Sequence, residues 1–254
     1  MEQVPLRRLL ENAYEQFSQS LHSANARFVL WASFRDADDL QQHYFSTKGK
    51  LHLVDKRRNE LSLTDDELVL KNVVQRSSIE AAEYVEWARL QNGQPILQEM
   101  LVSYCSAFEA CLKNVALVCK LASSKRGGLD DQVFVPGPQF SRVVRELKDA
   151  WNDARPDDEK SRAEVFFESF IQSCSHPDSN INILHSTSPE WSVCRSAFVL
   201  RNAIVHQLGR PSQQVELGLS TFHPGWEMQL TPKDVDFVKN ALLRILGRDM
   251  YQIL

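Results

Sequence analysis

The sequence has few glycines and prolines, no low-complexity tract and no internal repeat. Nine glycines and ten prolines stand among 254 residues, and no period of the kind that builds solenoids recurs. Charges interrupt every apolar stretch before the roughly 18 residues that cross a membrane, and the start MEQVPLRRLLENAYEQ lacks the apolar core of a signal peptide. These absences exclude a repeat architecture and lead us to expect a cytoplasmic protein that does not enter a membrane.

Motifs for bound nucleotides and metals are also missing. Neither G-x-x-x-x-G-K nor G-x-G-x-x-G occurs, and no C-x2-C pair or spaced pair of histidines suggests a metal site. Three of the five cysteines, at 105, 111 and 119, lie within one apolar helical pattern, so buried reduced thiols explain them better than disulfides. We therefore expect no metal and no cofactor.

The charge balance is slightly acidic. With 29 Lys and Arg against 33 Asp and Glu, the formal net charge is −4, which argues against binding nucleic acid over a broad surface. A local basic site remains compatible with this balance. The content of 43% hydrophobic and 24% charged residues is that of a globular chain long enough for one large or two small domains.

Apolar residues recur at steps of three and four along most of the chain, which predicts a mainly α fold. We divide it into an N-terminal, mainly helical extension (1–78) and a helical domain (79–254). Predicted helices lie near 6–17, from Thr64, and over 96–122, 140–152, 158–173, 190–208 and 232–254. A hairpin turning at His223–Gly225 is expected before the last helix, 123–139 is expected as an exposed loop, and 27–56 stays open between short helices and a strand.

Three polar residues, Arg201, Asn202 and His206, end an otherwise apolar predicted helix. Asn202 and His206 are four apart and share a face, whereas Arg201 and His206 lie about 140° apart around the helix axis. Two copies packed about a two-fold axis would bring two Arg201 and two His206 side chains into one cleft. Such a cleft suits metal-free RNA cleavage, in which an imidazole moves the 2′-hydroxyl proton and a guanidinium holds the phosphate, leaving a 2′,3′-cyclic phosphate.

The run RNAIVHQLG, together with the preceding helix LVSYCSAFEACLKNV, resembles the HEPN superfamily of small helical domains over about residues 80–254. The resemblance implies a four- or five-helix bundle that dimerises through the motif helix. It also implies a metal-independent endoribonuclease in a toxin, abortive-infection or other antiviral defence role. The family's motif falls on Arg201, Asn202 and His206, and its acidic helix position falls on Glu109.

Further expectations concern partners and RNA contacts. Arg195 and Arg210 stand six residues before Arg201 and four after His206, where they either bind RNA phosphates or are solvated. Expected partners are RNA, such as tRNA, a second copy of the chain, and an antitoxin or regulatory protein. In the HEPN branch regulated by adenylylation a Tyr follows the His by two residues. Here that position is Leu208, so this regulation is not expected.

A non-catalytic interpretation stays open, because some HEPN domains serve only as dimerisation or ligand-binding modules. Arg201 and His206 could instead satisfy the carbonyls at a helix C-terminus, and Glu109 could pair with Arg195 or Arg201. One further group of acids is expected on an exposed helix face: Glu159, Glu164 and Glu168.

Overall fold

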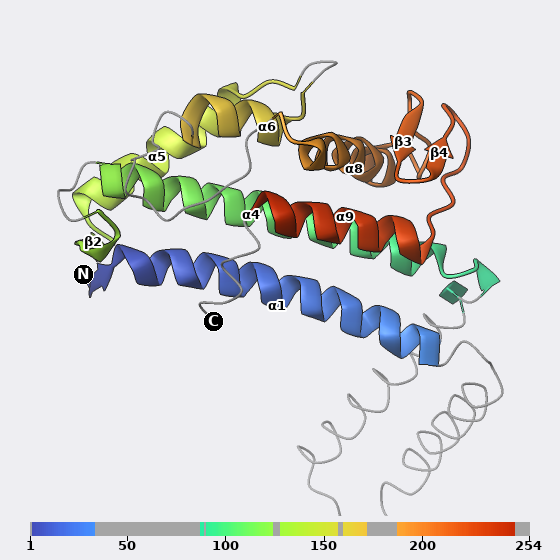
Figure 1. The fold of residues 1–254 in the computed structure, drawn as a ribbon, viewed down its shortest axis with the longest axis horizontal. Coiled ribbons are helices and arrows are strands. Elements are labelled where there is room, and N and C mark those ends of the chain that lie inside the picture. The colour runs from blue at the N-terminus through green and yellow to red at the C-terminus, as the bar shows by residue number, and fades with distance from the viewer. Residues whose placement is uncertain are drawn as a thin grey trace, which may run out of the picture. The chain divides into compact units, whose positions relative to one another are not determined.

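The computed structural model describes residues 2–33, 87–88, 90–123, 128–156, 160–171 and 187–246 (Figure 1). By its internal contacts the chain divides into two compact units, one formed by 1–24 with 98–254 and the other by 25–97. The predicted boundary between 78 and 79 lies outside the described residues, as does the helix predicted from Thr64.

The described part of the chain is mainly helical, with two small two-stranded sheets, which confirms the predicted fold class at this level. In chain order the elements are β1 (Glu2–Pro5), α1 (Leu6–Ser33), α4 (Gln94–Ser123), the short 3-10 helix η1 (Gly128–Asp130), β2 (Gln132–Val135), α5 (Pro138–Asp153), α6 (Arg162–Phe166), the π-helical turn η2 (Phe167–Ile171), α8 (Pro189–His206), β3 (Val215–Leu217), β4 (Ser220–Phe222) and α9 (Pro232–Ile245).

Helix α4 is the core helix that the sequence predicts. Phe108 near its middle is fully buried and meets Trp191 of α8 edge to face, with ring centroids 5.9 Å apart. By length and composition α4 could cross a membrane, but 56% of its most apolar window is buried inside the protein, as in the core helix of a bundle. Among the described residues the free cysteines are buried, which confirms the structural thiols. Burial raises the pKa of Cys111 to about 12.

Helix α9 begins where the Thr-Pro-Lys-Asp pattern predicts. Thr231 is its N-cap and forms a capping box with Asp234, whose backbone N–H donates to the Thr231 hydroxyl over 3.3 Å. Asp234 also accepts a hydrogen bond of 2.7 Å from Ser220 on β4. The same carboxylate therefore joins the start of α9 to the hairpin.

A Thr231→Ala variant is expected to lose about 1 kcal/mol of the free energy of unfolding, because one helix N–H loses its acceptor. Urea unfolding of the full chain measures the difference. The matched control is Thr221→Ala on β4, an exposed threonine for which we expect a change within about 0.5 kcal/mol. Equal losses in the two variants would contradict the capping role.

The predicted C-terminal hairpin forms, but its turn and second strand lie earlier in the chain than predicted. Strand β3 pairs with β4 across a two-residue turn at Gly218 and Leu219, not across His223–Gly225. Gly218 has a φ of +60°, which glycine adopts without Cβ strain and which tight hairpin turns require. The segment 226–230, which follows the predicted turn, is irregular, with Met228 buried and Trp226 exposed.

The exposed loop predicted over 123–139 is wrong for part of its length. Strand β2 forms there and pairs antiparallel with β1, with Gln3 opposite Phe134. The backbone N–H of Leu6 extends this contact to Asp131 O over 3.0 Å, and Arg7 pairs with Asp130 at 2.9 Å. Local sequence did not reveal this strand, because its partner lies more than 120 residues away.

In two other segments the observed secondary structure differs from the prediction or extends it. The segment left open from residue 27 is helical as far as Ser33, where α1 ends, and its remainder lies outside the described residues. The helix predicted over 158–173 is described from Arg162, and it widens from an α-helix to a π-helix at Phe167.

Candidate functional site at the end of helix α8

Arg201 lies on the buried side of α8. The buried residues Trp191, Cys194 and Phe198 recur at helical spacing, and Arg201 follows Cys194 by two turns on the same face. Its side chain is half-buried, and its Nε has no hydrogen-bond partner within the described part of the chain. Its Nη1 donates to the side-chain oxygen of Asn202 over 3.0 Å. The guanidinium thus keeps one N–H donor that is buried and has no acceptor within the described part of the chain, which is costly unless an acceptor reaches it.

Asn202 and His206 are exposed, one turn apart on the face that the sequence predicts. His206 is the last residue of α8, and the helix then closes with a bond from Gly209 N–H to the Ala203 carbonyl over 3.0 Å. No hydrogen bond or ion pair to the His206 imidazole occurs among the described residues. The ring is therefore accessible from solvent.

Leu208, two residues after His206, has an unusual conformation. Its φ is +52°, in the left-handed region that non-glycine residues rarely adopt, and its side chain is 91% exposed. Val205, on the preceding turn, is 48% exposed. The candidate site is therefore bordered by apolar surface that the described part of the chain leaves uncovered.

Glu109 lies half-buried on α4, close to the contact between α4 and α8. Burial raises the pKa of the Cys105 thiol; the positive charge of Arg201 lowers this pKa and the negative charge of Glu109 raises it. Both charges are therefore near Cys105. Even so, the described contacts contain no ion pair between Glu109 and either Arg195 or Arg201, which leaves that predicted pairing without support.

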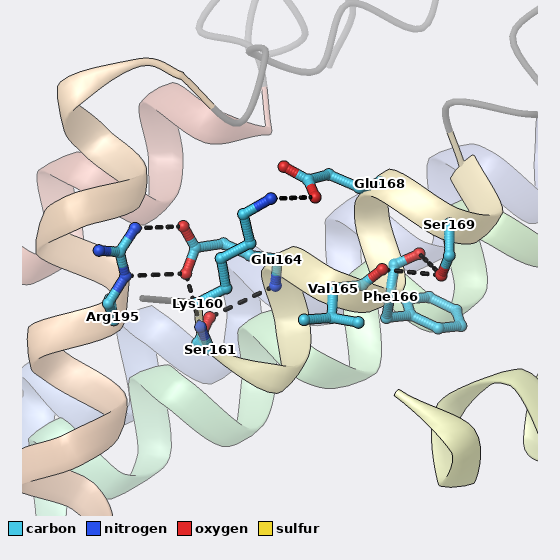
Figure 2. A network of polar contacts seen from close by, with 8 residues as sticks. All are labelled: Lys160, Ser161, Glu164, Val165, Phe166, Glu168, Ser169 and Arg195. Atoms are coloured by element: carbon cyan, nitrogen blue, oxygen red, sulfur yellow. Dashed lines mark hydrogen bonds and ion pairs between the residues drawn. The ribbon is translucent and has the colours of Figure 1, made fainter. Parts of the chain in front are cut away.

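Arg195 is held by a different acid (Figure 2). Its Nη2 donates to Glu164 Oε1 over 2.8 Å and its Nε donates to Glu164 Oε2 over 3.3 Å, so the guanidinium binds both carboxylate oxygens. Ser161 N–H donates to the same Oε2 over 2.7 Å. The charge of Arg195 is thereby neutralised, and this arginine is not directed to the end of α8.

The exposed acidic face predicted for Glu164 is wrong. Its side chain is 1% exposed, and Glu168 is only partly exposed and pairs with Lys160 at 2.6 Å (Figure 2). Glu159 lies outside the described residues. The pattern Ser161-x-x-Glu164 is a capping box that fixes the start of α6. Recognising it would have identified Glu164 as a structural residue.

Arg210 is exposed just beyond the end of α8. Its backbone N–H donates to the Gln207 carbonyl over 3.1 Å, while the neighbouring Gly209 carbonyl accepts from Met228 N–H over 2.9 Å. These bonds hold the segment that carries Arg210 against the irregular segment before α9. Arg201, Asn202 and His206 lie on the last turns of α8 and Arg210 lies just beyond it, but the Arg201 side chain is on the buried side whereas the other three are exposed. One chain supplies a single imidazole there.

No family model, curated protein or solved structure matches this chain. Among the described residues no group of three His, Cys, Asp or Glu side chains is placed to hold a metal ion.

Proposed function

We propose that this protein is a metal-independent endoribonuclease of the HEPN type that acts as a cytoplasmic homodimer in a toxin or antiviral defence role. The observation that carries the proposal is the exposed His206 on the same helix face as Asn202, which accepts a hydrogen bond from the half-buried Arg201. Asn202 binds the guanidinium and faces solvent with His206. Two copies of α8 packed about a two-fold axis would bring an imidazole and a guanidinium into one cleft, and this pair fits phosphodiester cleavage.

The reaction needs two proton transfers, which explains why a dimer is proposed. The 2′-oxygen attacks phosphorus and loses its proton to a base, while the bond from phosphorus to the 5′-oxygen breaks and that oxygen gains a proton from an acid. Two His206 side chains related by a two-fold axis supply one base and one acid. Arg201 would hold the phosphate as its negative charge builds, and Arg210 would bind a neighbouring phosphate.

The exposed apolar residues support association through this end of α8. Leu208 and Val205 present uncovered apolar surface next to His206. A left-handed backbone at a leucine costs about 1–3 kcal/mol and tends to persist at functional sites. Burial of Leu208 against a second copy offsets part of this cost. Glu109 has a supporting role in the proposal. Its charge and that of Arg201 both shift the pKa of the Cys105 thiol, so both lie near Cys105.

The purified protein is expected to cleave RNA in the presence of EDTA. Incubation with total RNA and with tRNA, followed by analysis of the product ends, should give 2′,3′-cyclic phosphates and 5′-hydroxyls, because no metal-activated water takes part. Products with 3′-hydroxyl ends, or cleavage that EDTA stops, would contradict the mechanism.

A second function, that of a non-catalytic dimerisation or ligand-binding module, is favoured by the same apolar residues at 205 and 208. It predicts a stable dimer that leaves RNA intact in this assay. Sedimentation of the same sample gives the oligomeric state. RNA cleavage and oligomeric state, measured on one preparation, therefore distinguish the two functions.

A further inference from the structure

A groove lies between α4 and α5, separate from the end of α8. The two helices run antiparallel (Figure 1), and Lys113 Nζ on α4 lies 3.7 Å from the centroid of the Trp151 ring on α5. The groove has a volume of about 230 Å³. Pockets for drug-sized ligands measure roughly 300–1,000 Å³, so this groove suits a smaller molecule.

The groove has two lysines and one apolar end. It is lined by Lys113, Asn114 and Leu117 of α4 and by Val144, Leu147, Lys148 and Trp151 of α5. Because the helices are antiparallel, Lys113 lies at the same end as Trp151, Leu117 and Val144 lie at the opposite end, and Leu147 and Lys148 lie between. Residues 144 and 151 are seven apart, so the groove is about 10 Å long. Val144 is 41% exposed, so part of its apolar side chain is open to a ligand in the groove.

Within the described part of the chain neither Lys113 nor Lys148 forms an ion pair. Lys113 is half-buried, and desolvation lowers its pKa; nearby Glu109 raises that pKa and Arg162 lowers it. A partly desolvated ammonium group that has no carboxylate partner gains more free energy on binding an anion than a fully solvated ammonium group does.

We propose that this groove binds a small amphipathic anion, with its charged head between Lys113 and Lys148 and its apolar chain or ring along Leu117, Val144 and Leu147. The two lysines favour a negatively charged ligand, the apolar side chains favour an apolar chain or ring attached to that charge, and the volume of the groove limits the size of the ligand. The site lies outside the proposed catalytic residues, so it does not depend on the proposed function.

Isothermal titration calorimetry of the full chain tests the proposal with four probes: octanoate, acetate, octan-1-ol and octylammonium. Octanoate is expected to bind at least about tenfold more tightly than each of the others, because acetate lacks the apolar body, octanol lacks the charge and octylammonium repels the lysines. Equal binding of octylammonium or octanol, or no heat from octanoate at millimolar concentration, would overturn the proposal.

Variants then assign the charged end. Lys113→Gln is expected to weaken octanoate binding by about tenfold, and Lys148→Gln by about threefold, because Lys148 is exposed. The matched control is Arg145→Gln, which removes one positive charge from an exposed position of α5 outside the groove and should leave the affinity unchanged. An equal loss in Arg145→Gln would show a general charge effect and overturn the assigned site. Circular dichroism checks that each variant is folded.

Discussion

An Arg195→Ala variant is expected to lose about 3–5 kcal/mol of its free energy of unfolding, the range for breaking a buried ion pair on one side. The partner left behind is Glu164, whose side chain is 1% exposed. Among the described residues, two of the three donors to this carboxylate belong to Arg195, and the Ser161 N–H is the one that would remain. A carboxylate that loses two donors is costly to keep ionised here, because its own side chain is 1% exposed and little water reaches it.

The opposite substitution should cost less. Glu164→Gln keeps the side-chain shape and leaves Arg195 without its anion, but that guanidinium is 37% exposed and water can solvate it. We expect a loss of about 1–3 kcal/mol. Arg195→Ala is therefore expected to lose more stability than Glu164→Gln, because the partner that it leaves behind is the more buried one.

Urea unfolding of the full chain measures both losses, and Arg210→Ala is the control. Arg210 is also an arginine near the end of α8, but it is exposed and should change stability by less than about 0.5 kcal/mol. If Arg195→Ala were as stable as Arg210→Ala and cleaved RNA less well, Arg195 would have the RNA-binding role that the sequence suggested. A large loss of stability assigns it to the contact between α6 and α8.

The helices could be predicted from the sequence because their signals are local. The apolar residues of α4 recur without a glycine or proline, and Thr231-Pro232 with Asp234 is a cap that acts within one turn. The hairpin was found for the same reason. Its turn was misplaced because alternation continues past Gly218, and only pairing between β3 and β4 decides where the chain reverses.

The contacts that position the candidate site were not predictable in the same way. Glu164 and Arg195 are 31 residues apart, and the spacing of acids around Glu164 fits an exposed helix face equally well. Likewise the helical pattern of α8 shows that Arg201 follows Cys194 on one face, but not that its Nε is buried without an acceptor among the described residues. Burial depends on what packs against a helix, which periodicity alone does not contain.

His206→Ala is expected to lower the rate of RNA cleavage by about 10²- to 10⁴-fold, the contribution of a positioned general acid or base. Its fold and dimer should persist, because His206 is exposed and no described residue hydrogen-bonds its ring. His22→Ala is the matched control, since it removes another exposed histidine, on α1, and should leave the rate unchanged. Single-turnover cleavage in EDTA measures the rates, and sedimentation measures the dimer.

Arg201→Lys separates the two roles at the site. Lysine keeps the positive charge but loses the planar fork of donors, including the buried Nε, so transition-state binding should fall by about 10²- to 10³-fold.

A mixed dimer of one wild-type and one His206→Ala chain tests whether the site is composite. In a composite site this dimer has one imidazole where the reaction needs a base and an acid. It should then be nearly as slow as the dimer in which both chains carry His206→Ala. A mixed dimer with half the wild-type rate would show instead that each protomer holds a complete site, and the two-fold arrangement would have to be abandoned.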